Sequence, residues 1–224
     1  MKLFAVDTAL GACSVALLDG DVIRAHIFEA MDRGHAERIA PMVEEAMKGT
    51  EFSALQRLAV TVGPGTFTGQ RVGLAFMRGL RLALRRPLTG VTTLGVMAVA
   101  AAAETGRSKA AAIHDARRDE AYLLLQQGAD VILEPTVMPF TDALARIRAF
   151  GPCALAGSGA AIASDALGAD YVLSSVRQPD ALWLARLAQR LPEPQQVPGP
   201  LYLRAPDAKL PGGRSIGQPS EAKV

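Results

Sequence analysis

Three glycines within seven residues make one segment of this chain well suited to hold an anion. The segment lies between an apolar stretch typical of a strand, 58–62, and a pattern typical of a helix, 70–86, and it contains Gly63, Gly65, Thr66 and Gly69. Glycine lets the backbone turn sharply and approach another molecule closely. The free N–H groups and the dipole at a helix N-terminus favour a phosphate. The same pattern suits a tight turn from strand to helix that binds nothing, so both interpretations stay open.

Asp7 is the second residue whose type and place could serve phosphate chemistry. It follows a predicted strand, 3–6, and precedes Thr8 in a turn-like segment. Some phosphotransferases hold a magnesium-bound nucleotide with an aspartate in this place. The alternative is that the carboxylate accepts backbone N–H bonds and caps the turn, and the absence of nearby basic residues favours it. The candidate nucleotide or anion site consists of Asp7, Thr8, Gly63, Gly65, Thr66 and Gly69.

Other catalytic and cofactor motifs are absent from the sequence. No G-K-[ST] occurs, which excludes a P-loop, and the glycine spacing has one residue too many for a dinucleotide fingerprint. The chain has three histidines, His26, His35 and His114, and none has a histidine or cysteine three or four residues further on. A G-x-S-x-G nucleophile elbow is also missing. We therefore expect no catalytic residue, no metal and no cofactor.

Composition narrows the class of protein. The 224 residues have a formal net charge of +2, which is too small to argue for nucleic-acid binding by itself. No uncharged apolar run approaches the roughly 20 residues of a membrane span, and the N-terminus does not resemble a signal peptide. Cys13 and Cys153 form no C-x-x-C pair, which is typical of reduced thiols. The expected location is the cytoplasm.

Periodicity and turn residues predict an α/β protein with two similar halves. The first half contains strands 3–6, 12–18, 22–27, 58–62 and 88–91 and helices 35–48, 70–86 and an alanine-rich one within 89–103. The second contains strands 109–114, 121–126, 131–138, 153–156 and 171–174, helices 141–150, 160–166 and 180–191, and a last short strand, 201–204. Thr141 is a plausible N-cap. We predict domains 1–106 and 107–205, followed by a flexible tail, 206–224.

Two helices have side-chain patterns that point to a partner. On helix 35–48 a wide apolar arc comprises His35, Ile39, Met42, Val43, Ala46 and Met47 with Ala36 and Ala40. Because this arc exceeds what one packing contact needs, it could face the core and a second protein together. On helix 70–86 we expect Val72, Phe76, Leu80 and Ala83 to point inward. The arginines Arg71, Arg78, Arg81 and Arg85 form a stripe that could touch RNA phosphate, although a solvated face is the commoner explanation.

Several separated segments together resemble the TsaB family, also called YeaZ. They are AVDTA (5–9) with ACSVAL (12–17), HAERIAPM (35–42), GPGTFTGQRVG (63–73), DARRDEAY (115–122) and LYLR (201–204). Their order and spacing cover nearly the whole chain up to Arg204. The glycine run in its full form is highly specific, and the other segments are jointly strong.

The resemblance implies a two-domain actin/Hsp70-like fold and a role in making threonylcarbamoyladenosine (t6A) in tRNA. It implies a non-catalytic subunit that docks on TsaD, meets TsaE and tRNA within the complex, and forms a homodimer when alone. The expected partner-binding residues are His35, Ile39, Met42, Val43, Ala46, Met47, Arg71 and Phe76. The sister subunit TsaD has two histidines on its metal helix, whereas here Ile39 follows His35 at the fourth position. An ATP/Mg-dependent phosphotransferase or hydrolase with Asp7 as magnesium partner is the alternative.

Overall fold

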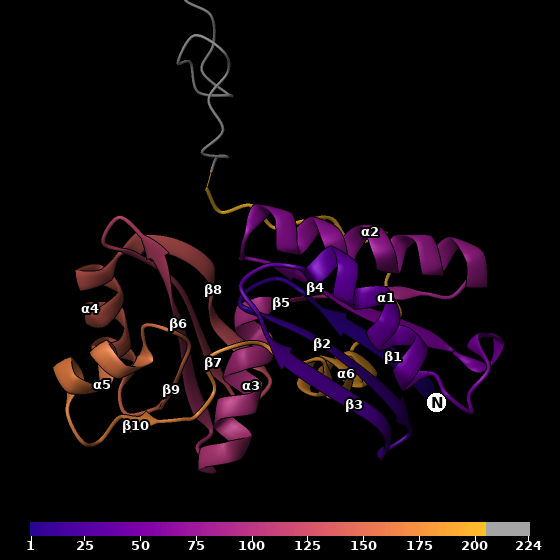
Figure 1. Ribbon diagram of the computed structural model, residues 1–224. Helices are drawn as coiled ribbons and strands as arrows, with labels where there is room; N and C mark the ends of the chain where they lie inside the picture. Colours follow the sequence, from indigo (N-terminus) through magenta and orange to yellow (C-terminus); the bar gives the residue numbers. More distant parts are fainter. Residues whose placement is uncertain (205–224) are drawn as a thin grey trace, which may run out of the picture.

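The computed structural model describes residues 1–204, so the predicted tail 206–224 lies outside the described residues. Two five-stranded sheets lie side by side, each with helices against it (Figure 1). This architecture confirms the predicted α/β class with one mixed sheet in each half. The first sheet has the order β3-β2-β1-β4-β5 and the second the order β10-β9-β6-β7-β8.

The two sheets share one plan. In the first, β1 (Lys2–Asp7), β2 (Ala12–Asp19) and β3 (Val22–Ala30) form an antiparallel meander, and β4 (Arg57–Gly63) and β5 (Leu88–Thr92) extend it in parallel. In the second, the meander is β6 (Lys109–Arg117), β7 (Glu120–Gln127) and β8 (Asp130–Pro139), and the parallel strands are β9 (Ala154–Ala156) and β10 (Val172–Leu173). Residues 201–204 are not a strand, contrary to expectation.

Helices cover these sheets in a definite order (Figure 1). On one face of the first sheet lie α1 (His35–Ala46) and α2 (Phe67–Leu84), near the short 3₁₀ turn Phe52–Ala54. The other face is covered by α6 (Ala181–Arg190), and α3 (Thr93–Thr105) lies between the two sheets. The far face of the second sheet packs on α4 (Phe140–Phe150) and α5 (Ala160–Leu167). Thr141 lies inside α4, whose N-cap is Pro139 rather than Thr141.

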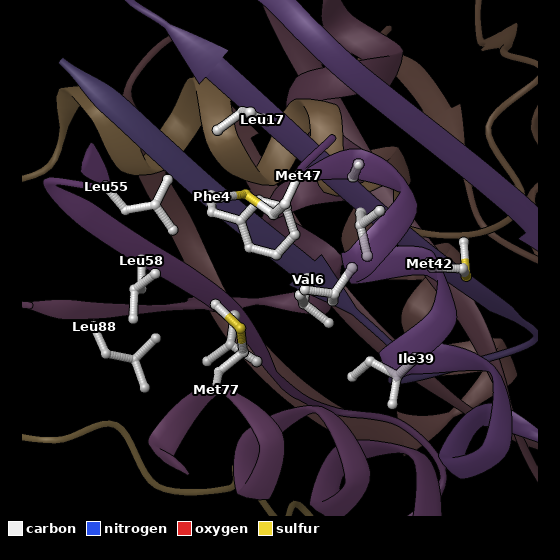
Figure 2. Packing of buried hydrophobic residues seen from close by; sticks show 14 of the residues in the cluster. Phe4, Val6, Leu17, Ile39, Met42, Met47, Leu55, Leu58, Met77 and Leu88 are labelled. Carbon is white, nitrogen blue, oxygen red and sulfur yellow. The ribbon is translucent and has the colours of Figure 1, made fainter. Parts of the chain in front are cut away.

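The core of the first lobe forms where β1 meets α1 and α2. Figure 2 shows Phe4 and Val6 of β1 in one cluster with Ile39 of α1 and Met77 of α2. All four side chains are buried. Burying a side chain of this size contributes roughly 1.5–3 kcal/mol, so this cluster fixes both helices on the sheet.

The last helix returns to the first lobe. The predicted boundary falls at Gly106, the C-cap of α3, which lies between the two sheets. However, Ala181, Leu184 and Ala185 of α6 are buried against strands of the first sheet, and the α6 N-terminal N–H of Ala181 donates to Ser14 Oγ at 2.9 Å. The range 107–205 is therefore not one structural unit, because α6 completes the first lobe.

No helix within residues 1–204 has the length and hydropathy needed to cross a membrane.

Candidate functional site

The glycine run packs against the turn that follows β1. A Cβ atom on Gly65 would lie 2.3 Å from the carbonyl oxygen of Ala9, and one on Gly69 would lie 2.2 Å from that of Thr8. Both distances are below van der Waals contact, so only glycine fits. Thr8 Oγ1 donates to the Gly69 carbonyl at 2.7 Å, and the Thr66 N–H donates to the Ala9 carbonyl at 2.8 Å. This close internal approach explains Gly65 and Gly69 without any ligand.

The helix after the glycine run starts earlier than predicted. Thr66 is the N-cap of α2, and its hydroxyl accepts a hydrogen bond from the Gly69 N–H at 3.1 Å. The first turn of the helix therefore contains Gly69, and the expected start at Gln70 is wrong by three residues. Threonine is a favoured N-cap, so the residue type of Thr66 is the sequence signal that could have revealed the correct start.

Asp7 is completely buried at the carboxyl end of β1. Its Oδ1 accepts hydrogen bonds from Thr61 Oγ1 at 2.5 Å and from the Ala9 N–H at 3.3 Å, while Oδ2 has no partner. Burial raises the pKa of Asp7 to about 7, although the two hydrogen bonds oppose this, and the charge of Asp180 adds to the rise. The carboxyl group thus caps its turn, as the alternative interpretation proposed, and a metal ion would reach it only after the fold opened.

The histidines do not assemble a metal site. Within residues 1–204 no cluster of three or more His, Cys, Asp and Glu side chains is suitably placed for a metal ion. His35 is buried, and its Nε2 lies 3.0 Å from the carbonyl oxygen of Leu10, which it meets as a donor. This contact gives His35 a structural role, because it holds the start of α1 on the β1–β2 turn.

The apolar arc of α1 is buried in the chain's own core. The exposed fractions are 8% or less for His35, Ile39, Met42, Val43, Ala46 and Met47. The large side chains of this arc are therefore core residues that pack on β1, β2 and α2, and only its two alanines, Ala36 and Ala40, are exposed. These six side chains are not presented to a partner, and partner contact through them would require the first lobe to rearrange.

The surplus apolar surface lies on α2 instead. Its buried face is formed by Gly73, Leu74 and Met77. The predicted inward residues Val72, Phe76 and Leu80 are only partly buried at the flank of this face, and Ala83 is exposed.

We define the outward face of α2 as the residues that a helix of 100° per residue places opposite the buried face. They are Ala75, Gly79, Leu82 and Ala83, all exposed, with the partly buried Val72 and Phe76 beside them. Leu82 is 71% exposed. These four residues are small or apolar, and the exposed Arg71 lies at the N-terminal end of the same side as Leu82.

Part of the arginine stripe fastens the C-terminal segment to α2. Arg78 donates from Nε and Nη2 to the carbonyl oxygen of Pro198, at 3.1 and 2.6 Å. Arg71 donates to the hydroxyl of Tyr202 at 2.9 Å. These two arginines hold the segment 198–202, which we call the strap, along the side of α2. The hydrogen bonds of Arg71 and Arg78 therefore stabilise the fold, and they explain these two arginines without an RNA ligand.

Arg81 and Arg85 have a different environment. They line a groove of about 490 Å³ together with residues 193–197, at the C-terminal end of α2. The RNA interpretation of the stripe therefore applies at most to this end of the helix.

A cavity of about 350 Å³ separates the two lobes at the N-terminal end of α2. We call it the interlobe cavity. It is lined by Leu10 and residues 64–67 and Gln70 of the first lobe, by His114–Arg117 and Tyr122 of the second, and by 201–204. Sequence reasoning missed it, because its walls come from three segments far apart in the chain. The motif DARRDEAY was the one available signal for the second-lobe wall.

Comparisons with known proteins agree with this architecture. The family model described as TsaD, tRNA N6-adenosine threonylcarbamoyltransferase, matches residues 25–167, which is more than half of the chain. Among curated relatives, the Escherichia coli "tRNA threonylcarbamoyladenosine biosynthesis protein TsaB" is 42% identical over 124 residues, 54% of this chain and 53% of the relative. The Bacillus subtilis protein of the same name is 29% identical over 142 residues, 61% of this chain and 60% of the relative. The matches thus span little more than half the length of these curated relatives.

A solved structure is similar over almost all of the described chain. The structure described as YeaZ from Pseudomonas aeruginosa superposes with a TM-score of 0.78 at 32% identity, covering 90% of this chain and 99% of that one. A second structure from the same organism, described as similar to peptidase YeaZ, has the same TM-score at 33% identity, covering 91% and 99%. The glycine run, the two-lobed fold and these matches lead to one conclusion: the chain belongs to the TsaB/YeaZ family.

Proposed function

We propose that this chain acts in the biosynthesis of threonylcarbamoyladenosine in tRNA as a non-catalytic subunit that binds TsaD. The names of its curated relatives support the pathway, and the match to the TsaD family model supports a shared fold with that enzyme. In this proposal the chain supplies a docking surface and TsaD supplies the chemistry. It self-associates through the same surface when alone, and it meets TsaE and tRNA within the complex.

The observation that carries the proposal is the small and apolar surface on the outward face of α2. A soluble helix normally directs charged side chains to water, and small residues let a second helix approach closely. Ala75, Gly79 and Ala83 recur at intervals of four residues on this face, and Leu82 is the most exposed large apolar side chain described. Stable complexes typically bury roughly 800 Å² on each partner. One helix face supplies only part of this area, so the neighbouring helix α1 would supply the remaining contact area. Its exposed Ala36 and Ala40 are also small.

The non-catalytic part of the proposal is supported by Asp7. In the alternative, an ATP/Mg-dependent enzyme, this carboxylate would be ionised and open to a metal ion. It is instead sealed from solvent with a pKa of about 7, which favours the neutral acid in the interior. The nearby glycines are occupied by contacts with Thr8 and Ala9 rather than left open for a phosphate.

Charged substitutions on the outward face of α2 test the proposal. We expect Leu82→Glu and Ala75→Glu to weaken the affinity for TsaD at least ten-fold, about 1.4 kcal/mol, because each would bury an unpaired carboxylate in the interface. The measurement is capture of purified TsaD from the same organism by the immobilised full-length chain, followed by calorimetric titration. Circular dichroism verifies that each variant is folded.

Ile162→Glu is the matched control. Ile162 is 60% exposed on α5 of the second lobe, so it is a comparable apolar side chain far from α2. It should bind TsaD like the wild type. Met42 and Val43 are unsuitable targets because they are buried, and charge there would report on folding. Wild-type affinity in both α2 variants would show that the docking surface lies elsewhere, and failure of the wild-type chain to bind TsaD would refute the proposal.

A further inference from the structure

The groove of about 490 Å³ at the C-terminal end of α2 is lined by three arginines. Arg81 lies in the last turn of the helix, Arg85 is its C-cap, and Arg86 follows directly. Residues 193–197, which connect α6 to the strap, supply most of the remaining lining. We call this feature the basic groove. Two segments far apart in the chain thus meet around a cluster of guanidinium groups.

Two of these three guanidinium groups have no task in the fold. Arg86 donates from Nη2 to the carbonyl oxygen of Ser53 at 3.2 Å. Arg81 and Arg85, in contrast, form no hydrogen bond or ion pair with another residue of the described range 1–204. They differ in this from the arginines earlier on α2, which hold the strap. The cations at this end of the helix are therefore free to meet an external anion.

The lining residues give the basic groove a positive charge. Among them Glu193 is the single carboxylate. The C-terminal end of a helix adds roughly half a negative charge, so the three arginines leave a net charge of about +1.5. One cation would be enough to compensate the helix end. The helix dipole therefore explains only part of this cluster, and the groove attracts anions.

The chemistry of the lining favours a phosphate chain over a free nucleobase. Arg85, Gln195 and Gln196 are exposed, so a large ligand can reach them. A guanidinium group matches the geometry of a phosphate, and side-chain amides can hydrogen-bond ribose hydroxyls. The described residues that line the groove include no aromatic ring on which a base could stack. Such a site reads the sugar–phosphate backbone and not the base sequence.

The basic groove also adjoins the outward face of α2. Leu82 belongs to that face and lines the groove as well. A polyanion bound along the groove would therefore lie at the edge of the surface that we assign to TsaD. One ligand could then contact both subunits of the complex.

We propose that the basic groove binds the sugar–phosphate backbone of tRNA, with Arg81 and Arg85 each pairing with one phosphate. The choice of tRNA over another polyanion rests on the proposed function, which brings this chain and tRNA into one complex. Binding in the groove itself does not require TsaD. No covalent step is involved.

Fluorescence anisotropy of a labelled tRNA transcript, titrated with the full-length chain alone, tests the groove. We expect a dissociation constant on the order of 10⁻⁴ M at about 20 mM KCl, and a slope of roughly −1.8 for log K against log[KCl], because two phosphates are neutralised. Arg81→Gln and Arg85→Gln should each weaken binding about ten-fold and reduce the steepness of the slope by roughly 0.9.

Arg146→Gln is the matched control. Arg146 is an exposed arginine on α4 of the second lobe, and it has no hydrogen bond or ion pair with another residue of 1–204. Its loss removes the same charge far from the groove and should change neither the affinity nor the slope. Circular dichroism verifies that all variants are folded.

Three results would overturn the proposal. The first is an affinity that does not respond to KCl, and the second is wild-type affinity in the double variant Arg81→Gln/Arg85→Gln. The third is equally tight binding of polyglutamate at the same concentration of charge, which would favour an acidic protein segment.

Capture of TsaD by the same variants separates this inference from the proposed function. If the chain captures TsaD but does not bind tRNA, only the groove assignment fails. If it binds tRNA through Arg81 and Arg85 but does not capture TsaD, the groove assignment holds and the docking role is refuted.

Discussion

Replacing Gly69 by alanine is expected to lower the free energy of unfolding by about 3 kcal/mol or more. The new Cβ would lie 2.2 Å from the Thr8 carbonyl oxygen and 2.6 Å from Thr66 Oγ1. Backbone cannot move aside as the end of a flexible side chain can, so the first turn of α2 must shift and lose its cap. Urea unfolding at pH 6, followed by circular dichroism, measures the change.

Gly79→Ala is the matched control on the same helix. A Cβ at Gly79 would meet no atom within 4 Å, and alanine is a better helix former than glycine by roughly 0.5–1 kcal/mol. We therefore expect this variant to be more stable than the wild type. If Gly69→Ala lost less than about 1 kcal/mol, the close packing of the glycine run would be incorrect. The glycines would then be better explained by the approach of an external ligand.

The local part of the fold could be predicted from the sequence. Turn residues such as Asp19 and Gly20 and the alternation of apolar residues located both meanders, and the structure confirms them. These signals arise within a few residues of one another. By contrast, the return of α6 to the first sheet depends on contacts of Ala181 and Leu184 with strands more than a hundred residues earlier. Helical periodicity shows that α6 has an apolar face but not which sheet covers it.

The phase of α2 could not be predicted because the helix is apolar on two sides. Val72, Phe76 and Leu80 recur with helical spacing and were expected to point inward, but Gly73 and Met77 occupy the buried face. Glycine adds no hydrophobicity to a helical pattern, so the side that packs most closely gave the weaker signal. On α1 the pattern also did not reveal burial, because the sheet and α2 together cover the large side chains of its arc.

The candidate site was predicted in part. Asp7 and Thr8 do meet the glycine run in space, since Thr8 donates to the Gly69 carbonyl. Their chemistry differs from the nucleotide interpretation, because the contacts are internal. The interlobe cavity needed Arg117 and Tyr202 together, and no spacing rule connects residues in different lobes. Contacts between segments far apart in the chain are therefore the part of the site that could not be predicted.

The stability of this chain is expected to fall as the pH rises from about 4 to about 7, and Asp7 is the cause. The pKa of this carboxyl group is raised from 3.8 to about 7 in the folded state, mainly by burial. Between these two pH values the folded chain keeps a proton that the unfolded chain releases, so the free energy of unfolding decreases with pH. Three pH units correspond to a loss of up to ~4 kcal/mol, complete by about pH 8.

Asp7→Asn should abolish this loss. An amide keeps the acceptor for Thr61 and Ala9 but does not ionise, so we expect the variant to be more stable than the wild type at pH 8, by up to ~4 kcal/mol, and to differ little at pH 4. Urea midpoints of both proteins across this pH range give the comparison, which cancels the titration of all other groups. Asp170→Asn, at an exposed position, should leave the wild-type profile unchanged.

The same variant separates a subunit from an enzyme. A carboxylate that bound magnesium would be stabilised in its ionised form, so Mg-ATP would raise the midpoint of the wild type at pH 8 and have no effect on Asp7→Asn. We expect Mg-ATP to leave both midpoints unchanged, because the unpaired Oδ2 of Asp7 lies in the protein interior. A shift specific to the wild type would show that Asp7 binds magnesium and would favour the enzyme alternative, and parallel pH profiles of the two proteins would contradict the raised pKa. If neither occurs, the burial of Asp7 lowers the stability of the fold near neutral pH. Its role is then structural: it caps the turn that contacts the start of α2.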